Sequence, residues 1–345
     1  MGEWVYTPGV ATHLLVGNPT AQSGRNARRI QTAIDLLRTR GIDCDLFSTL
    51  PGGRTIAALR ETLDRAPYTC VISMGGDGTF REVASALYAS SRREEVAMGM
   101  FPTGTANDQG RSFGLEAREE ALERNADVIA QGRETRLDAG LITTRNHDGD
   151  LTASGAFFDS AGWGLSARTL ATRNRDRRVV DAMGPLKEIY RDQLVYAGAL
   201  MKNFIESYVV HDKFRARVVT DGQVHELEGL TDLIVKNTRY YGGAWVFDRT
   251  SRHDDGLFEI VPFRGKRDWT SKAIVDLDGN PLTEEVLNLV GIEHSRPFRA
   301  KRLEMTLFPP AGGAALAAQI DGEEFLAGEA VEIDVAARAI RLIVP

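Results

Sequence analysis

Apolar residues recur along the first 138 positions in two alternating patterns, short continuous runs and longer runs at helical spacing. The short runs predict buried strands, and the spaced runs predict helices that bury one stripe. The expected strands are 13–17, 43–48, 70–74 and 96–101, and the expected helices are 25–40, 55–65, 80–88 and 118–131. This strand–helix alternation predicts an α/β domain, a parallel sheet with helices on both faces.

The pattern changes near Asp138, where short strand-like runs separated by turn dipeptides such as Asp221-Gly222 take over. These runs predict a mainly antiparallel β-sandwich. The expected strands are 136–143, 156–160, 215–220, 233–236, 257–262, 301–308, 331–335 and 339–344, with one helical region at 184–205. Because 345 residues favour two domains, we predict an α/β domain over 10–138, a sandwich over 139–345 and a cleft between them. The last strand is a candidate to return to the first domain.

Composition narrows the class of protein. Hydrophobic content of 43% and charged content of 26% are typical of a globular protein, and the net charge of −6 argues against a general nucleic-acid binder. Cys44 and Cys70 lie in apolar, strand-like contexts, which predicts reduced thiols and a reducing compartment. No signal peptide is apparent and no run approaches about 20 apolar residues, so we expect a cytoplasmic protein.

The most informative segment is Gly75-Gly76-Asp77-Gly78-Thr79, between the apolar run 70–74 and the helical segment 80–88. A glycine turn between a buried strand and a helix presents backbone N–H groups to an anion such as phosphate. The alternative is a tight connection without a ligand, in which Thr79 and Glu82 form a capping box. Asp77 fits a phosphate site only if Mg²⁺ or a proton acceptor is needed there.

A second small-residue turn, Pro102-Thr103-Gly104-Thr105-Ala106-Asn107-Asp108, follows the next expected strand. In an open α/β sheet both turns leave the carboxyl ends of strands at one edge, where ligands bind. Asn18-Pro19 with Ser23-Gly24 adds a third loop at that edge, although these dipeptides are common in loops.

Two acidic turns stand out in the second half. Gln319-Ile320-Asp321-Gly322-Glu323-Glu324 is read most simply as a hairpin turn. The second, His253-Asp254-Asp255-Gly256-Leu257, follows Tyr241-Gly242-Gly243 and lacks the spacing of an EF-hand loop. The chain has no Walker A motif, no GxGxxG fingerprint and no HExxH pair.

Taken together, these motifs resemble the diacylglycerol kinase catalytic-domain family, whose relatives include bacterial soluble lipid kinases, sphingosine kinases and ceramide kinases. The matching blocks, in order, are GGDGT at 75–79, GTAND at 104–108, Gly242-Gly243 with Asp255-Gly256, and Asp321-Gly322-Glu323. The resemblance covers about 12–345, and it implies an active site in the cleft between the two domains.

Carried over residue by residue, the resemblance implies a catalytic base and an ATP site. Glu323 resembles the base that takes the proton of the lipid hydroxyl, and Asp77 is implied beside the phosphates through Mg²⁺. The implied ATP-site residues are Asn18, Thr49, Gly75, Gly76, Asp77, Gly78, Thr79, Arg81, Gly104, Thr105 and Asn107.

The resemblance also implies two Mg²⁺ positions. Asp138 resembles an acidic residue that joins Asp77 in a Mg²⁺–water network. Asp255, with the backbone carbonyls of Arg252 and Leu257, resembles a structural Mg²⁺ site.

The chain departs from the family pattern in places. Arg249 and Ser251 stand where the family often has proline and alanine, and Asp159 stands where it usually has asparagine. These departures bear on the structural metal and the shape of the cleft.

The resemblance implies an ATP- and Mg²⁺-dependent lipid kinase that phosphorylates a hydroxyl of a diacylglycerol-like lipid. The alternatives are a kinase of a sphingoid base or another lipid alcohol, an NAD kinase-like enzyme, and a non-catalytic nucleotide-binding regulator. The expected partners are ATP and a lipid at a membrane surface, with no nucleic acid, and a homodimer is left open. Basic and apolar residues over 173–191 predict transient docking on an anionic membrane, or else a solvated helical hairpin.

Overall fold

The computed structural model describes residues 11–19, 25–104, 106–168, 170, 213–242, 245–248, 250–265, 268, 296–310 and 316–345. The helical region expected at 184–205 and the basic segment 173–191 lie outside these ranges. So do Ser23, Gly24, Thr105, Gly243 and Arg249.

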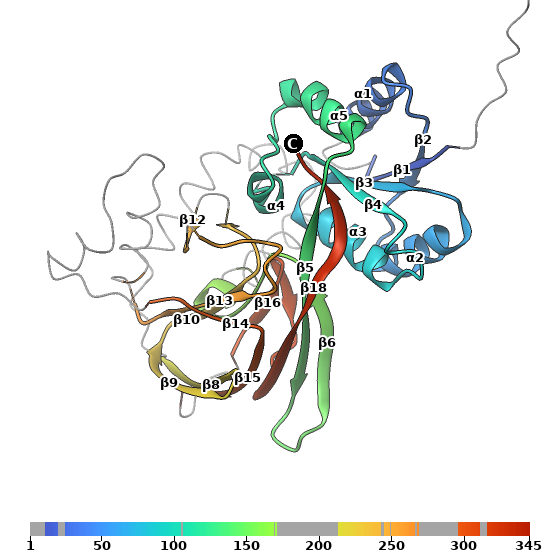
Figure 1. Ribbon diagram of the computed structural model, residues 1–345. Helices are drawn as coiled ribbons and strands as arrows, with labels where there is room; N and C mark the ends of the chain where they lie inside the picture. Colours follow the sequence, from blue (N-terminus) through green and yellow to red (C-terminus); the bar gives the residue numbers. More distant parts are fainter. Residues whose placement is uncertain are drawn as a thin grey trace, which may run out of the picture.

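The first part of the chain is a parallel sheet with helices on both faces, as predicted. Helices α1 and α5 lie on one side of strands β1 to β4, and helices α2 and α3 lie on the other (Figure 1). The elements are β1 His13–Gly17, α1 Arg25–Thr39, β2 Cys44–Ser48, α2 Thr55–Arg65, β3 Cys70–Gly75, α3 Asp77–Ala89, β4 Ala97–Pro102, α4 Asp108–Ser112 and α5 Leu122–Gln131. β3 and β4 are buried along most of their length, which explains their continuous apolar sequence.

The second part is mainly antiparallel, and this prediction is also confirmed. Its strands are β5 Glu134–Arg145, β6 Leu151–Phe157, β7 Ser160–Gly164, β8 Phe214–Thr220, β9 Gln223–Leu230, β10 Asp232–Lys236, β11 Tyr240–Tyr241, β12 Trp245–Val246, β13 Phe258–Phe263, β14 Phe298–Ala300, β15 Arg302–Phe308, β16 Ala318–Ile320, β17 Glu323–Phe325 and β18 Ala330–Ile343.

Two large sheets organise the described strands. The first has ten strands in the order β2-β1-β3-β4-β18-β15-β8-β9, with β5 paired to β18 and β6 paired to β5. The second has six strands in the order β14-β13-β10-β7-β16-β17. Apolar residues from both sheets, including Trp163, Phe214 and Phe258, pack into one buried cluster between them. A separate cluster fills the α/β part around β1, β3 and β4.

The last long strand, β18, connects the two parts of the ten-stranded sheet. It pairs in parallel with β4 through Leu342 and Met98, and in antiparallel with β5 and β15. The sequence pattern predicts two strands here, at 331–335 and 339–344. They form one strand because the register only shifts, between Ala336 and Ile340, where Arg338 takes a positive φ of 55°.

A strand expected at 156–160 is also corrected. β6 ends at Phe157 and β7 begins at Ser160, so the expected range is a corner where the chain passes from one sheet to the other. The backbone N–H groups of Phe158, Asp159 and Ser160 donate to the carboxylate of Asp321 rather than to a neighbouring strand. This corner carries part of the candidate site.

Candidate active site

The glycine turn joins β3 to α3 with no room for side chains. Gly76 is extended, with φ −92° and ψ −167°, and the helix begins at Asp77. A Cβ atom at Gly75 would collide with the side chain of Thr79. The capping-box interpretation is wrong, since Thr79 lies inside α3 and no side chain caps Gly76. The first turn of α3 therefore offers backbone N–H groups that have no helical partner.

The second small-residue loop lies directly against the first. A Cβ atom on Gly104 would collide with the backbone of Gly76, and Thr103 N donates to Gly75 O at 2.8 Å. Asn107 takes a positive φ of 53°, and its side-chain amide exchanges two hydrogen bonds of 2.8 Å with the backbone of Gly104. The two loops meet at one edge of the sheet.

Asn18 and Thr49 lie at that same edge, directly after β1 and β2. Thr49 N donates to Gly17 O at 3.0 Å, and Asn18 O accepts a hydrogen bond of 2.6 Å from the side chain of Asn26. The loops after β1, β2, β3 and β4 therefore share the carboxyl edge of the sheet, where ligands bind in open α/β folds. The ATP-binding roles of these residues stay predictions.

Asp77 lies in an environment that disfavours its negative charge. Burial, followed by the nearby carboxylates of Asp108 and Asp159, raises its pKa to about 7, although hydrogen bonds from the backbone N–H groups of Gln109 and Asn107 act in the opposite direction. Gln109 N lies 3.4 Å from Asp77 Oδ1. A carboxylate among other carboxylates gains a cation readily, so oxygen-rich surroundings at Asp77 fit a hard ion such as Mg²⁺.

The hairpin β16–β17 brings the second acidic turn to this place. Asp321 has a positive φ of 48°, and its buried carboxylate accepts hydrogen bonds from the N–H groups of Phe158, Asp159 and Ser160 at 2.7–3.1 Å. Burial, followed by the charge of Asp159, raises the pKa of Asp321 to about 6. The turn is thus a hairpin, as its simplest interpretation predicts, but its aspartate also fixes the β6–β7 corner.

Glu323, two residues further on, is exposed and reaches the first turn of α3. A Cβ atom on Gly78 would lie 3.6 Å from Glu323 Oε1. The glycine turn and the Asp-Gly-Glu hairpin, far apart in the sequence, are therefore neighbours in the structure.

Arg81, one helical turn beyond Asp77, adds a cation at the same place. Its Nε lies 3.9 Å from Asp321 Oδ2, and this buried nitrogen makes no hydrogen bond within the described residues. An open groove of about 510 Å³ begins beside it and passes between α3 and the β5–β6 hairpin, with Tyr88, Ile142 and Ala156 in its lining. Its volume is in the range of pockets that bind small ligands.

Comparison with known proteins shows which protein family this chain resembles. The model of the diacylglycerol kinase catalytic domain matches residues 12–142. A probable lipid kinase YegS-like of Klebsiella pneumoniae is 40% identical over 122 residues, 35% of this chain and 39% of that protein. A diacylglycerol kinase of Mycobacterium tuberculosis is 25% identical over 254 residues, 71% of this chain and 70% of that protein.

The chain therefore carries a diacylglycerol kinase catalytic domain over residues 12–142. Its fold agrees, because a putative diacylglycerol kinase from Bacillus anthracis superposes with a TM-score of 0.70 at 18% identity and covers 99% of both chains. The matched domain and the relatives indicate an ATP-dependent lipid kinase.

Asp138 of the kinase has its carboxylate occupied by backbone donors. Oδ2 accepts from Gly256 N at 2.7 Å, and Oδ1 accepts from Arg338 N at 2.6 Å. Asp138 N donates to His253 O at 2.8 Å. Burial raises the pKa of this carboxyl. Asp138 thus ties the 253–256 turn to the register shift of β18, and its role in a Mg²⁺–water network stays a prediction.

The second implied metal position lies in the turn that Asp138 holds. Asp255 Oδ1 accepts a hydrogen bond of 3.1 Å from Leu257 N, and Arg252 pairs with Asp254 at 3.0 Å. Within the described ranges, no group of three or more His, Cys, Asp and Glu side chains is placed to hold a metal. A site made of one carboxylate and backbone carbonyls would not form such a group, so the structural Mg²⁺ also stays a prediction.

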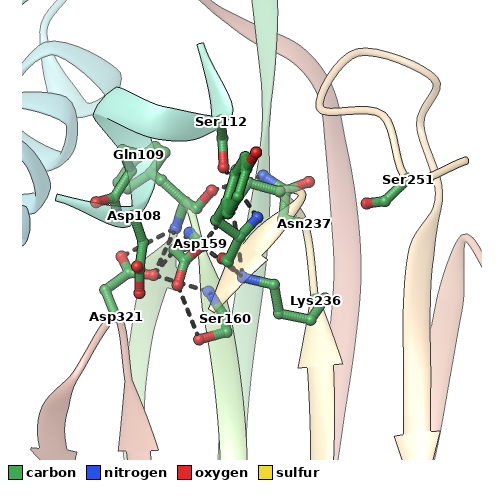
Figure 2. A network of polar contacts seen from close by, with 12 residues as sticks. Asp108, Gln109, Ser112, Asp159, Ser160, Lys236, Asn237, Ser251 and Asp321 are labelled. Atoms are coloured by element: carbon green, nitrogen blue, oxygen red, sulfur yellow. Dashed lines mark hydrogen bonds and ion pairs between the residues drawn. The ribbon is translucent and has the colours of Figure 1, made fainter. Parts of the chain in front are cut away.

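Sequence reasoning missed members of the polar network that surrounds Asp77. Figure 2 shows Asp108, Asp159 and Asp321 gathered from three segments, with Lys236 pointing to Asp159. Asp108 Oδ2 accepts a hydrogen bond of 2.6 Å from Gly242 N. One signal could have been read: Lys236 ends the apolar run Leu233-Ile234-Val235 on a strand that is buried throughout.

Proposed function

We propose that the kinase transfers the γ-phosphate of ATP to a hydroxyl of a diacylglycerol-like lipid and gives a phosphatidate-like product. The observation that carries the proposal is the approach of the Glu323 carboxylate to the first turn of α3, next to Asp77. Phosphoryl transfer to an alcohol needs an anion cradle, charge neutralisation and a proton acceptor, and this place supplies candidates for each.

Each group has a task in the proposed reaction. Backbone N–H groups of the glycine turn hold phosphate oxygens, and the guanidinium of Arg81 adds positive charge beside them. Glu323 accepts the proton of the lipid hydroxyl, whose oxygen forms the new bond to phosphorus as ADP leaves. Asp77, together with Asp108, would hold Mg²⁺, which offsets negative charge on the transferred group.

The position of Glu323 and the names of the relatives both support a lipid alcohol as the acceptor. Glu323 is exposed, so an alcohol presented at a membrane surface can approach it without burying the whole lipid. Relatives named diacylglycerol kinase, which align with 71% of this chain over 70% of their own length, support a glycerol-based lipid alcohol. No helix in the described part of the chain is long and apolar enough to cross a membrane. Transient docking at the membrane surface, and a homodimer, remain proposals.

A lipid panel tests the proposal. The protein is incubated with γ-labelled ATP, Mg²⁺ and mixed micelles that contain diacylglycerol, a sphingoid base or a monoacylglycerol, and with NAD in a parallel reaction. We expect label in the phosphatidate fraction for the wild type and none for Asp77→Asn. Label in the sphingoid base or in NAD alone would move the acceptor to that class. Absence of label everywhere, with ATP still bound, would favour a nucleotide-binding regulator.

A further inference from the structure

A buried ion pair lies behind the candidate active site. Lys236 Nζ lies 2.6 Å from Asp159 Oδ1, and the two side chains are only 2% and 6% exposed. The hydroxyl of Thr238 also donates to Asp159 Oδ1. Burying charged groups costs free energy unless they are paired and hydrogen-bonded. The position of this buried pair therefore points to a role other than stabilising the fold.

Lys236 extends from this pair to the loop that follows β10. Its Nζ also donates to Tyr240 O at 2.6 Å, which fixes the backbone of 238–242. From that loop, Tyr240 N donates to Ser112 Oγ at 3.1 Å and Gly242 N donates to Asp108 Oδ2 at 2.6 Å. The loop is therefore hydrogen-bonded to both ends of the short helix α4. Gln109 N of this helix lies 3.4 Å from Asp77 Oδ1.

Asp159 extends from the pair in the other direction. Its own N–H donates to Asp321 Oδ1 at 2.7 Å, and its carbonyl accepts from Asn237 N at 2.8 Å. Asp321 lies in the turn of the hairpin that carries Glu323. A series of hydrogen bonds thus links Asp321 through Asp159 and Lys236 to α4 (Figure 2), and Gln109 N of α4 continues it to Asp77.

We propose that Asp159 and Lys236 are positioning residues. This buried ion pair, called the strut below, fixes the positions of Asp77 and Glu323 relative to each other. This inference rests on the proposed function. Neither residue needs to touch ATP or lipid, because each acts through the backbone it holds. Displacement of catalytic groups by about 1 Å can cost about 100-fold in rate, so a strut of this kind affects turnover more than nucleotide affinity.

The test is the charge-balanced double variant Asp159→Asn with Lys236→Met. Removing Lys236 alone would leave a buried carboxylate unpaired and endanger folding, whereas the double variant leaves no uncompensated charge. We expect kcat to fall about 100-fold while KM for ATP stays within about twofold. Hydrogen–deuterium exchange should show that the amides of Tyr240 and Gly242 lose protection.

A matched control removes another ion pair of the same chain. Arg341 and Glu134 form two contacts of 2.7 Å at the start of β5 and the end of β18, away from the strut. The double variant Glu134→Gln with Arg341→Met should lower the melting temperature but leave kcat within about twofold of the wild type.

The outcomes separate the strut from the proposed function. Retained kcat with retained amide protection at Tyr240 and Gly242 overturns the strut. An equal loss of kcat in both double variants also overturns it, because general destabilisation would then explain the effect. If the wild type phosphorylates no lipid, the proposed function fails, and amide exchange alone still decides whether the pair holds the loop.

Discussion

Asp77 is a carboxylate in a turn that otherwise prepares a site for an anion. Within the described part of the chain its main electrostatic neighbours are the carboxylates of Asp108 and Asp159, which raise its pKa further after burial. The charge is tolerable when a cation and a nucleotide arrive together. A buried carboxylate that destabilises the protein without ligands, and that can bind a cation when the ligands are present, is typical of an active site.

Because burial disfavours the charged form of Asp77, the free energy of unfolding should depend on pH. Its pKa rises from 3.8 to about 7, so the folded protein retains this proton over a window in which the unfolded chain has lost it. Stability from this group is therefore lost as the pH rises from about 4 to 7.

The variant Asp77→Asn carries an amide that cannot titrate at this position. Its free energy of unfolding, relative to the wild type, should therefore rise by roughly 2 kcal/mol from pH 5 to pH 8. Urea denaturation at the two pH values, without nucleotide or Mg²⁺, measures the difference. A difference that is the same at both values would contradict this account of Asp77.

Asp138 invites a different test, because its two carboxylate oxygens accept backbone N–H groups. In Asp138→Asn the amide nitrogen must replace one acceptor and face a donor. We expect the free energy of unfolding to fall by about 2 kcal/mol, equally with and without Mg²⁺. Urea denaturation in chelator and in Mg²⁺ checks this. A loss seen only in Mg²⁺ would instead support the Mg²⁺–water network.

At the residue scale, the sequence predicts only those site residues that lie in a short local motif. Asp77 and Glu323 could be named because each lies in a short motif between apolar runs. The Asp159–Lys236 pair could not, since its members are 77 positions apart and meet only through strand pairing of β7 with β10. Asp321 was read as a turn residue, and its hold on the β6–β7 corner depends on the same long-range assembly.

At the scale of elements, the glycine turn and the loop after β4 touch at the carboxyl edge of the sheet, where ATP is proposed to bind. Gly104→Ala places a methyl group against the backbone of Gly76, which cannot move without displacing α3. We expect KM for ATP to rise at least about tenfold, because a displaced anion cradle loses its aligned N–H groups.

Gly155→Ala is the control, since its added Cβ would meet only side chains of Ile320 and Phe325 at 3.4 Å and 3.6 Å. Steady-state kinetics on both variants makes the comparison. An unchanged KM in Gly104→Ala would show that the loops do not need this contact.

Most elements of the α/β part could be predicted because the central strands β3 and β4 are continuous apolar runs and the longer helices keep one apolar stripe. β1 and α2 agree with the expected bounds residue for residue. The sandwich was harder. β9 was missed because its sequence is largely polar and only Leu227 and Leu230 are buried. The single strand β18 was split because Arg338 and its neighbours interrupt the apolar pattern at the register shift.

At the scale of the whole molecule, the candidate site is made where distant parts of one chain meet. β5 and β18 run from the α/β part into the sandwich without a break, and together they align the two halves (Figure 1). The glycine turn supplies the proposed anion cradle from one half, and the β16–β17 hairpin supplies Glu323 from the other. We propose that these two features form one active site.

The most direct test of that claim is the rate of γ-phosphate transfer to diacylglycerol by Glu323→Gln, measured under saturating ATP. We expect kcat to fall about 10²- to 10⁴-fold, as for loss of a general base, with KM for ATP nearly unchanged. The neighbouring variant Glu324→Gln, whose side chain lies on the opposite face of β17, should retain wild-type turnover. Wild-type turnover in Glu323→Gln would contradict the account.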